Sequence, residues 1–258
     1  MAVRDAYPLL EVSGLSVRYP GLTGPRARPA VHDVDLVVHA GESVGVVGQS
    51  GAGKSTVART ITGELRPTGG RVRLAGRDLF AGPRWLAERR RGAMRMMVPD
   101  GYAALPPHRT VAAIIGQQTA PRRCARAQLV DTLDRVGLCP GHLDRYPHQL
   151  NHGERQRVVL AGALVCRPRM VIADEPSDPN CTRDGAELAE LLGELAGEFG
   201  IAVLHLTSDL DLARRACGRL VVLRGGRVVE HGPTDRVLAH PQHPYTEALV
   251  ADAGVRAA

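Results

Sequence analysis

The residues best suited to chemistry lie in the stretch GQSGAGKST, residues 48–56. A glycine, four residues and then Gly-Lys-Ser is the spacing of a phosphate-binding loop. An apolar run at 44–47 predicts a short buried strand before the stretch, and Val57, Ile61 and Leu65 predict a helix after it. Glycines let successive backbone N–H groups point at phosphate oxygens, and a helix N-terminus adds partial positive charge. The pattern therefore predicts phosphate binding between a strand and a helix.

Lys54, inside this stretch, is the only lysine among the 33 lysine and arginine residues of the chain. A lysine ammonium on a flexible stem reaches phosphate oxygens as a point charge, which a bulkier planar guanidinium does not reproduce. The alternative is a glycine-rich turn with a chance lysine. Retention of one lysine at this position favours phosphate binding.

Two carboxylates, Asp174 and Glu175, follow the apolar run MVIA. Ligands of open α/β sheets bind at the carboxyl ends of the strands. An aspartate there is suited to hold Mg²⁺ together with the Ser55 hydroxyl, and the neighbouring glutamate is suited to polarise an attacking water. The alternative is a strand that ends in two solvated acids.

Composition limits the class of protein. No apolar run approaches the ~20 residues of a membrane span, and the N-terminus lacks a signal-peptide core, so we expect no membrane span. The net charge of +6 is spread over the chain, with one arginine cluster at 84–95, so a solvated helix face is favoured over a nucleic-acid partner. The five cysteines, an odd number without CxxC spacing, predict buried thiols in a reducing cytoplasm and neither disulfides nor a zinc site.

Strand and helix patterns alternate along the chain. Strands are expected at 10–20, 31–42, 44–47, 69–79, 169–176 and 200–209, with a hairpin at 218–232. Helices are expected at 54–65, 83–91, 110–118, 123–138, 153–166 and 185–200, with short helices at 234–254. This predicts an α/β fold with a mostly parallel sheet covered on both faces, interrupted by a helical insert. The expected parts are a core at 1–82 and 166–230, the insert at 83–165 and a tail at 231–258.

The whole chain resembles the ATP-binding subunits of ABC transporters. The resemblance rests on the phosphate loop, the helical insert and the run LNHGERQRVVLAGALVCRPRMVIADEP at 150–176. The stretches ALPPHRTVAAII at 104–115 and HPQHPYTEALV at 240–250 narrow it to the dipeptide, oligopeptide and nickel importer branch. It implies a RecA-like P-loop NTPase core with an antiparallel β part near the N-terminus, and ATP and Mg²⁺ as cofactors. Because the chain lacks the cysteine-rich tail of the branch's longer members, we expect no iron–sulfur site.

The resemblance assigns roles to particular residues. Glu175 and Lys54 would be catalytic, Ser55 and Asp174 would hold the metal, and Tyr19 would stack on adenine, the alternative being a plain strand-end tyrosine. The nucleotide-binding residues would be Tyr19, Gly48, Gln49, Ser50, Gly51, Ala52, Gly53, Lys54, Ser55 and Thr56.

Four positions depart from the family pattern. Pro99 replaces a metal- and water-contacting glutamine, Ser208 replaces a switch histidine, and residues 178–181 read Asp-Pro-Asn-Cys where Ser-Ala-Leu-Asp is expected. The signature Leu-Ser-Gly-Gly-Gln reads Leu-Asn-His-Gly-Glu at 150–154. His205 is expected to be a satisfied core histidine and no substitute for the missing one. Since phosphoryl transfer depends on positioning and charge stabilisation, we expect nucleotide binding to be kept and turnover to be impaired.

The resemblance thus predicts an ATP-binding subunit that couples ATP binding and hydrolysis to import of peptides or a related small solute. Its partners would be membrane permease subunits and a second ATP-binding subunit, in a heterodimer rather than a homodimer. The expected location is cytoplasmic, peripheral on the inner face of the cell membrane. The alternative function is a non-hydrolysing structural or regulatory partner of a second ATPase subunit.

Overall fold

The structure is a computed structural model, and it describes residues 7–19, 29–83, 92–97, 105–119, 124–174 and 182–254, with the backbone alone at 182–186. The strands are β1 (Leu10–Val17), β2 (Val31–Val38), β3 (Ser43–Val47), β4 (Gly69–Leu74), β5 (Arg77–Asp78), β6 (Met94–Met97), β7 (Met170–Asp174), β8 (Ala202–Thr207), β9 (Arg219–Arg224) and β10 (Arg227–Pro233). The helices are α1 (Lys54–Ile61), α3 (Val111–Gln117), α4 (Arg126–Arg135), α5 (His152–Leu164), α6 (Thr182–Phe199), α7 (Leu210–Ala216), α8 (Thr234–Ala239) and α9 (Pro244–Asp252), with 3₁₀ turns η1 (Pro140–Asp144) and η2 (Pro147–Gln149).

The larger sheet has six strands in the order β10-β9-β3-β8-β7-β6. Every neighbouring pair runs parallel except β9 and β10, which form an antiparallel hairpin. Successive residues of β8 point to opposite faces, so that Leu204 packs into one core cluster and Val203 into another. Both faces of this sheet are therefore covered, as the alternation of strands and helices predicts.

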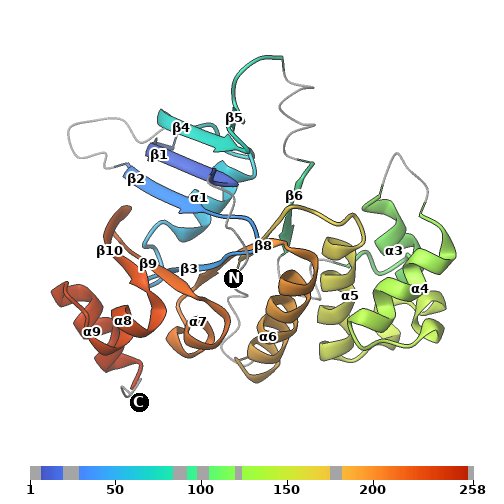
Figure 1. Ribbon diagram of the computed structural model, residues 1–258. Coiled ribbons are helices and arrows are strands. Elements are labelled where there is room, and N and C mark those ends of the chain that lie inside the picture. Colours follow the sequence, from blue (N-terminus) through green and yellow to red (C-terminus); the bar gives the residue numbers. More distant parts are fainter. Residues whose placement is uncertain are drawn as a thin grey trace.

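A second sheet is antiparallel, in the order β2-β1-β4-β5. Its strands β1, β2 and β4 share one core with α1 and one face of the larger sheet. The helices α6 and α7 lie on the opposite face of the larger sheet (Figure 1). The molecule thus has three layers: the antiparallel sheet with α1, the larger sheet, and the helices below it.

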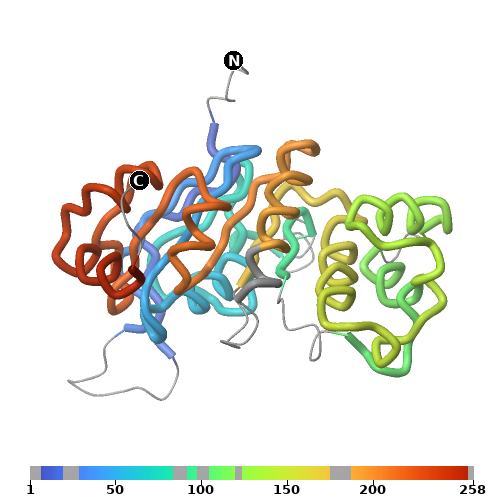
Figure 2. The backbone as a smooth tube through the Cα atoms, turned by 90° about the horizontal axis from the view of Figure 1, so that it is seen from below, coloured from blue at the N-terminus to red at the C-terminus, as the bar shows by residue number. Residues whose placement is uncertain are grey.

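The helices α3, α4 and α5 lie at one end of the molecule, and α8 and α9 lie at the other (Figures 1 and 2). The core of α3 to α5 is continuous with that under β7 and β8, because Leu133 and Leu160 belong to the same buried cluster as Val171 and Val203. The signature region and the C-terminal helices are therefore supported by opposite ends of one sheet.

The predicted α/β fold with a mostly parallel sheet and an antiparallel part near the N-terminus is confirmed. Three details differ from expectation, and the first is the helix α7, which no helical pattern predicted. The strand β6 lies in a stretch predicted to be mostly helical, where it pairs in parallel with β7 and forms the edge of the larger sheet. The helix α1 ends at Ile61, before the expected Leu65, because Gly63 with φ of 80° stops the helix. The expected helix at 83–91 lies almost wholly outside the described residues.

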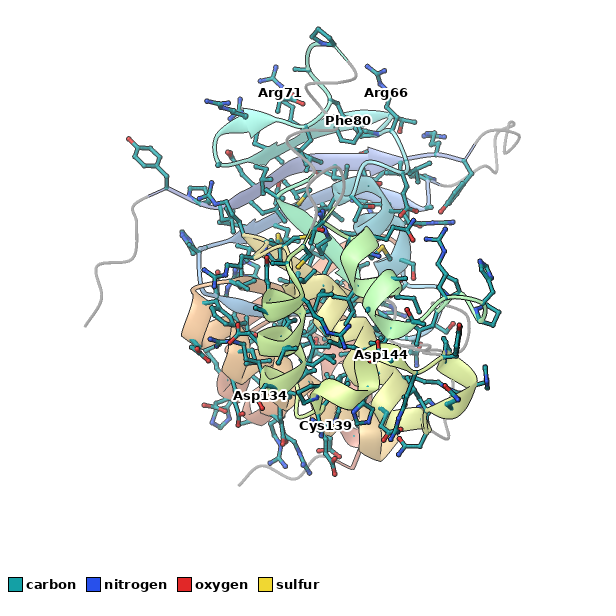
Figure 3. All side chains as sticks on the ribbon, turned by 90° about the vertical axis from the view of Figure 1, so that its right-hand side faces the viewer. Arg66, Arg71, Phe80, Asp134, Cys139 and Asp144 are labelled. Carbon is teal, nitrogen blue, oxygen red and sulfur yellow. The ribbon has the colours of Figure 1, made fainter. Side chains whose placement is uncertain are left out.

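The prediction of buried cysteines is wrong for three of the four that the structure describes. Cys217 is buried, Cys124 and Cys166 are half-buried, and Cys139 is exposed. Cys139 lies on the same side of the helical end as Asp134, far from Arg71 on β4 (Figure 3). Within the described ranges these four thiols are free, no cluster of His, Cys, Asp and Glu is suited to a metal ion, and no helix is long and apolar enough to cross a membrane. Cys181 lies outside those ranges.

Candidate nucleotide-binding site

The loop 48–53 connects the carboxyl end of β3 to the first residue of α1, as predicted. Gly48 and Gly53 are required by close packing and positive φ. A Cβ on Gly48 would lie 2.2 Å from the Leu223 carbonyl oxygen, and one on Gly53 would lie 2.9 Å from the Ala30 carbonyl oxygen. The backbone of the loop is thus pressed against β9 and the start of β2, and the glycines let it turn in a space that has no room for side chains.

Lys54, the first residue of α1, folds back over the loop. Its Nζ donates to the carbonyl oxygens of Gly48 and Gln49, the second at 3.3 Å. The amide of Ala52 donates to the Gln49 oxygen at 3.1 Å, which closes a tight turn. Lys54 therefore brings its charge to the concave loop at the N-terminus of α1, where an anion is favoured.

Asp174 lies at the same edge of the sheet as the phosphate loop. In the register of the parallel strands, Val47 pairs with Thr207, and Asp174 pairs with Leu206. The strands β3, β8 and β7 therefore end within one residue of the same level, and this row of strand ends carries the loop, Ser208 and Asp174.

The donor set fits Mg²⁺. Ser55 is exposed at the start of α1 and offers a hydroxyl, while Asp174 is half-buried at the end of β7 and offers a carboxylate. Oxygen donors of these two kinds are the ligands that Mg²⁺ takes beside phosphates. Glu175, the predicted catalytic carboxylate, lies outside the described residues.

Tyr19 lies next to the loop. The Tyr19 hydroxyl is 3.1 Å from the Oγ1 of Thr56, the last residue of the loop motif. Tyr19 itself is half-buried. The structure thus brings together Tyr19, the loop, and the row of strand ends, as expected for a shared site. Stacking on adenine stays a prediction.

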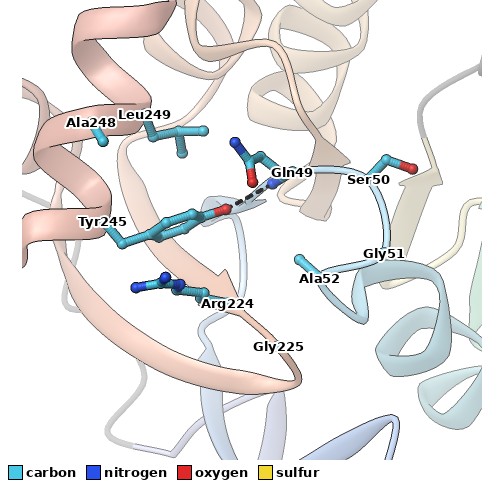
Figure 4. Close-up of a pocket in the computed structure, with 9 residues that line it drawn as sticks. All are labelled: Gln49, Ser50, Gly51, Ala52, Arg224, Gly225, Tyr245, Ala248 and Leu249. Carbon is cyan, nitrogen blue, oxygen red and sulfur yellow. Dashed lines mark hydrogen bonds between the residues drawn. The ribbon is translucent and has the colours of Figure 1, made fainter.

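A pocket of about 320 Å³ borders the other side of the loop (Figure 4). Its lining consists of Gln49, Ser50, Gly51, Ala52, Arg224, Gly225, Tyr245, Ala248 and Leu249. The backbone N–H of Gln49 donates to the Tyr245 hydroxyl at 3.0 Å, and the Arg224 guanidinium lies 4.9 Å from the centre of the Tyr245 ring. The C-terminal helix α9 is therefore in direct contact with the phosphate loop.

Comparison with known proteins agrees with this geometry. Residues 31–178, more than half of the chain, match the family model described as ABC transporter. A probable peptide ABC transporter ATP-binding protein of Sinorhizobium fredii is 40% identical over 96% of this chain and 73% of its own length. An oligopeptide transport ATP-binding protein of Salmonella typhimurium is 34% identical over 94% of this chain and 77% of its own length.

The chain belongs to the ABC transporter family. Its similarity to peptide transporter ATP-binding proteins places it in the peptide importer branch. CbiO1 of Clostridium perfringens, part of the ABC transporter complex cbiONQ, has a TM-score of 0.80 and 25% identity, covering 90% of this chain and 91% of that one. A bacterial Atm1-family ABC exporter with ATP bound shares the fold, with a TM-score of 0.76 and 23% identity over 99% of this chain and 43% of that one.

Of the positions that depart from the ABC transporter pattern, the structure describes Ser208 and the signature segment. Ser208 is exposed and directly follows Thr207, at the edge that carries the loop. His205 is 3% exposed, and burial lowers its pKa to about 4. It is a neutral core residue, but its Nε2 has no hydrogen-bond partner among the described residues, so the expectation of a satisfied histidine is wrong. Pro99 and residues 178–181 lie outside the described residues.

The signature segment of this ABC protein forms the N-terminus of α5. Asn151 Oδ1 accepts from the Glu154 N–H at 2.8 Å, and Glu154 Oε2 accepts from the Asn151 N–H at 2.9 Å, which is a capping box. Two hydrogen bonds lower the pKa of the Glu154 carboxyl. The larger effect comes from the Asn151 N–H, and the next comes from the His142 ring at 3.1 Å. Asn151 therefore caps α5, at a position type where asparagine and serine are both favoured.

Sequence reasoning missed the residues that hold the loop from behind. As sequence patterns, the HPYT stretch that contains Tyr245 indicates only the branch, and the hairpin at 218–232 that contains Gly226 indicates only a turn. The Gly226 N–H donates to the Ala52 oxygen at 2.8 Å. Neither contact has a signal in local spacing, because both join residues more than 170 positions apart.

Proposed function

We propose that this ATP-binding subunit of a peptide importer binds Mg-ATP on residues 48–56 and turns it over slowly in its own site. The observation that supports this most is the shared strand-end row, in which the phosphate loop, Ser208 and Asp174 emerge from neighbouring parallel strands. This row supplies groups for phosphate and metal binding. It has a serine where a histidine would contact the terminal phosphate.

Binding would be shared between backbone and side chains. The loop amides and the Lys54 ammonium would hold the phosphates, and Tyr19, already beside Thr56, would stack on adenine. Ser55 and Asp174 would hold Mg²⁺, which when bound neutralises charge on the phosphate oxygens.

Turnover would depend on Glu175, which is suited to polarise the attacking water. Pro99 and Ser208 stand where the family has a glutamine and a histidine. The loss of each of these positioning groups would lower the rate by a factor of about 10²–10³. Binding through backbone amides does not need those side chains, so affinity for ATP would be kept.

The expected ATPase partner of this chain follows from the same departures from the family pattern. A homodimer would have Pro99, Ser208, Asn151 and His152 in both composite sites, whereas pairing with a second, more standard ATPase subunit leaves each site only part of them. We therefore favour a heterodimer that docks on membrane permease subunits through the region 84–130, at the inner face of the cell membrane. The transported solute would be a peptide, in line with the names of the relatives.

The deciding experiment uses the complex of this chain with its co-encoded ATPase subunit, in which the partner's loop lysine has been replaced. The complex is incubated with Mg-ATP, and the retained nucleotide is identified by chromatography. Accumulating ADP that disappears in Glu175→Gln supports slow hydrolysis in this site. The matched controls are Lys54→Ala, which should lose the nucleotide, and Arg59→Ala, an exposed change on the same helix that should retain it.

ATP that stays intact for hours would contradict the proposal of slow hydrolysis in this site. It would support the alternative function, a non-hydrolysing partner of the second ATPase. A folded complex that retains no nucleotide would overturn ATP binding itself.

A further inference from the structure

Two hydrogen bonds join the backbone of the phosphate loop to α9 and to the turn between β9 and β10. The Gln49 N–H donates to the Tyr245 hydroxyl at 3.0 Å, and the Gly226 N–H donates to the Ala52 oxygen at 2.8 Å (Figure 4 shows the first bond). These bonds bracket the tight turn of residues 49–52. The direction of the loop amides therefore depends on the β9–β10 turn and on α9.

Tyr245 contacts His243 and Arg224, and the segment before it is held by Glu230. Its N–H donates to His243 Nδ1, the N-cap of α9, at 3.0 Å. The Glu230 carboxylate on β10 accepts from the amides of Gln242 at 2.9 Å and of His243 at 3.0 Å. The Tyr245 residue is 9% exposed, and the Arg224 guanidinium lies over its ring. These contacts restrict the ring that carries the hydroxyl, and a positioning group requires such restriction.

We infer that Tyr245 is a positioning residue of the phosphate site. Its hydroxyl accepts a hydrogen bond from the Gln49 N–H and so orients that amide toward α9. The orientation of this amide in turn fixes that of the amides that follow. In this role Tyr245 acts on the nucleotide through the backbone of the loop. The inference deepens the proposed function and rests on ATP binding at residues 48–56.

The test substitutes Tyr245→Phe in the full chain, which removes the hydroxyl and keeps the ring under Arg224. Loss of one hydrogen bond to a backbone amide should weaken Mg-ATP binding about fivefold in a titration. Amide hydrogen exchange of the loop peptide containing Gln49 should become faster, because that N–H loses its partner. The melting temperature without nucleotide should stay within about 2 °C of the wild type.

Two control variants separate positioning from packing. Tyr146→Phe makes the same chemical change at an exposed ring and should alter none of the three measurements. Leu249→Ala loosens α9 without touching the hydroxyl and should lower the melting temperature more than Tyr245→Phe does.

Unchanged or improved ATP affinity with unchanged exchange of the loop peptide would overturn the inference, as would a purely structural response in which both α9 variants lose stability alike. If the wild type binds no ATP, the proposed function fails, and the exchange measurement on the loop still decides whether Tyr245 holds Gln49.

Discussion

At the scale of single residues, the position of Ser208 is the most informative departure. It is exposed at the strand-end row, where family resemblance places an imidazole, and His205 cannot replace it. His205 is buried on β8, and with a pKa lowered to about 4 it carries no charge at neutral pH. Under the proposed function, the site therefore has one charge-stabilising group fewer than the family pattern and keeps its phosphate loop.

We predict that Ser208→His raises ATP turnover of the complex about tenfold or more, because a donor aimed at the developing phosphate charge is worth at least that much. The rate is measured as phosphate release under saturating Mg-ATP. Ser13→His, on the antiparallel sheet, serves as the control. An unchanged rate would show that the absent imidazole does not limit turnover.

The place of the loop between a strand and a helix could be predicted from local spacing, because a phosphate loop is a continuous stretch whose glycines serve its own turn. The residues that bind the back of that loop could not be predicted in this way. Tyr245 and Gly226 contact the loop only because β9, β10 and α9 return to it, and no local pattern in the sequence reports which tyrosine will donate or accept across such a distance.

At the scale of elements, α5 shows how a departure from the family pattern is tolerated. Asn151 and Glu154 each satisfy the other's backbone N–H, so the first turn of the helix is closed although the usual serine is absent. Glu154 is also bound by His142, which is 8% exposed, so the cap is tied to the preceding 3₁₀ turn η1.

We predict that Asn151→Ala lowers the free energy of unfolding by about 1 kcal/mol, as expected for loss of an N-cap side chain. Asn151→Ser, which restores the usual residue type, should stay within about 0.5 kcal/mol of the wild type. Urea-induced unfolding followed by circular dichroism measures both. Equal losses in the two variants would contradict the capping role.

Most elements were predictable from hydrophobic periodicity, and the exceptions have physical causes. The strand β6 has only four residues, MRMM, too short to show alternation, and it is a strand because β7 offers it a free edge. The helix α7 was missed because seven residues give less than two turns of pattern. Its start is nevertheless encoded by Asp209, whose carboxylate accepts from the amides of Asp211 and Leu212.

At the scale of the whole molecule, the two sheets are joined by an ion pair. Glu42, between β2 and β3, accepts from Arg219 Nε on β9 at 2.8 Å, and Arg219 also donates to the Val37 oxygen on β2. Burial alone would raise the pKa of Glu42, but the bonds from Arg219 and from the His39 N–H outweigh it and lower the pKa.

The lowered pKa predicts a pH dependence of stability. The folded carboxyl binds its proton less readily than the unfolded one, so its contribution is fully present above the unfolded pKa and is lost as pH falls through the folded pKa. Glu42→Gln should lower the free energy of unfolding by about 1–3 kcal/mol at neutral pH. Below about pH 5, that difference from the wild type should shrink.

Urea unfolding at a series of pH values measures the effect. Glu64→Gln is the matched control, because Glu64 pairs with Arg59 at 3.5 Å on the surface, where both side chains are more than half exposed. A Glu42→Gln deficit that stays constant down to pH 3 would contradict the assigned pKa shift.

The contact between Gln49 and Tyr245 also has a consequence for synthesis of the chain. The ribosome makes the loop first and must add 196 more residues before the tyrosine that holds it exists. At about 5–20 residues per second, that interval lasts on the order of 10–40 s. During it, the loop is present in the nascent chain without the bond from α9, and a product truncated before residue 245 never acquires it. The bond between Gln49 and Tyr245 therefore forms only after residue 245 has been made, well after the loop itself.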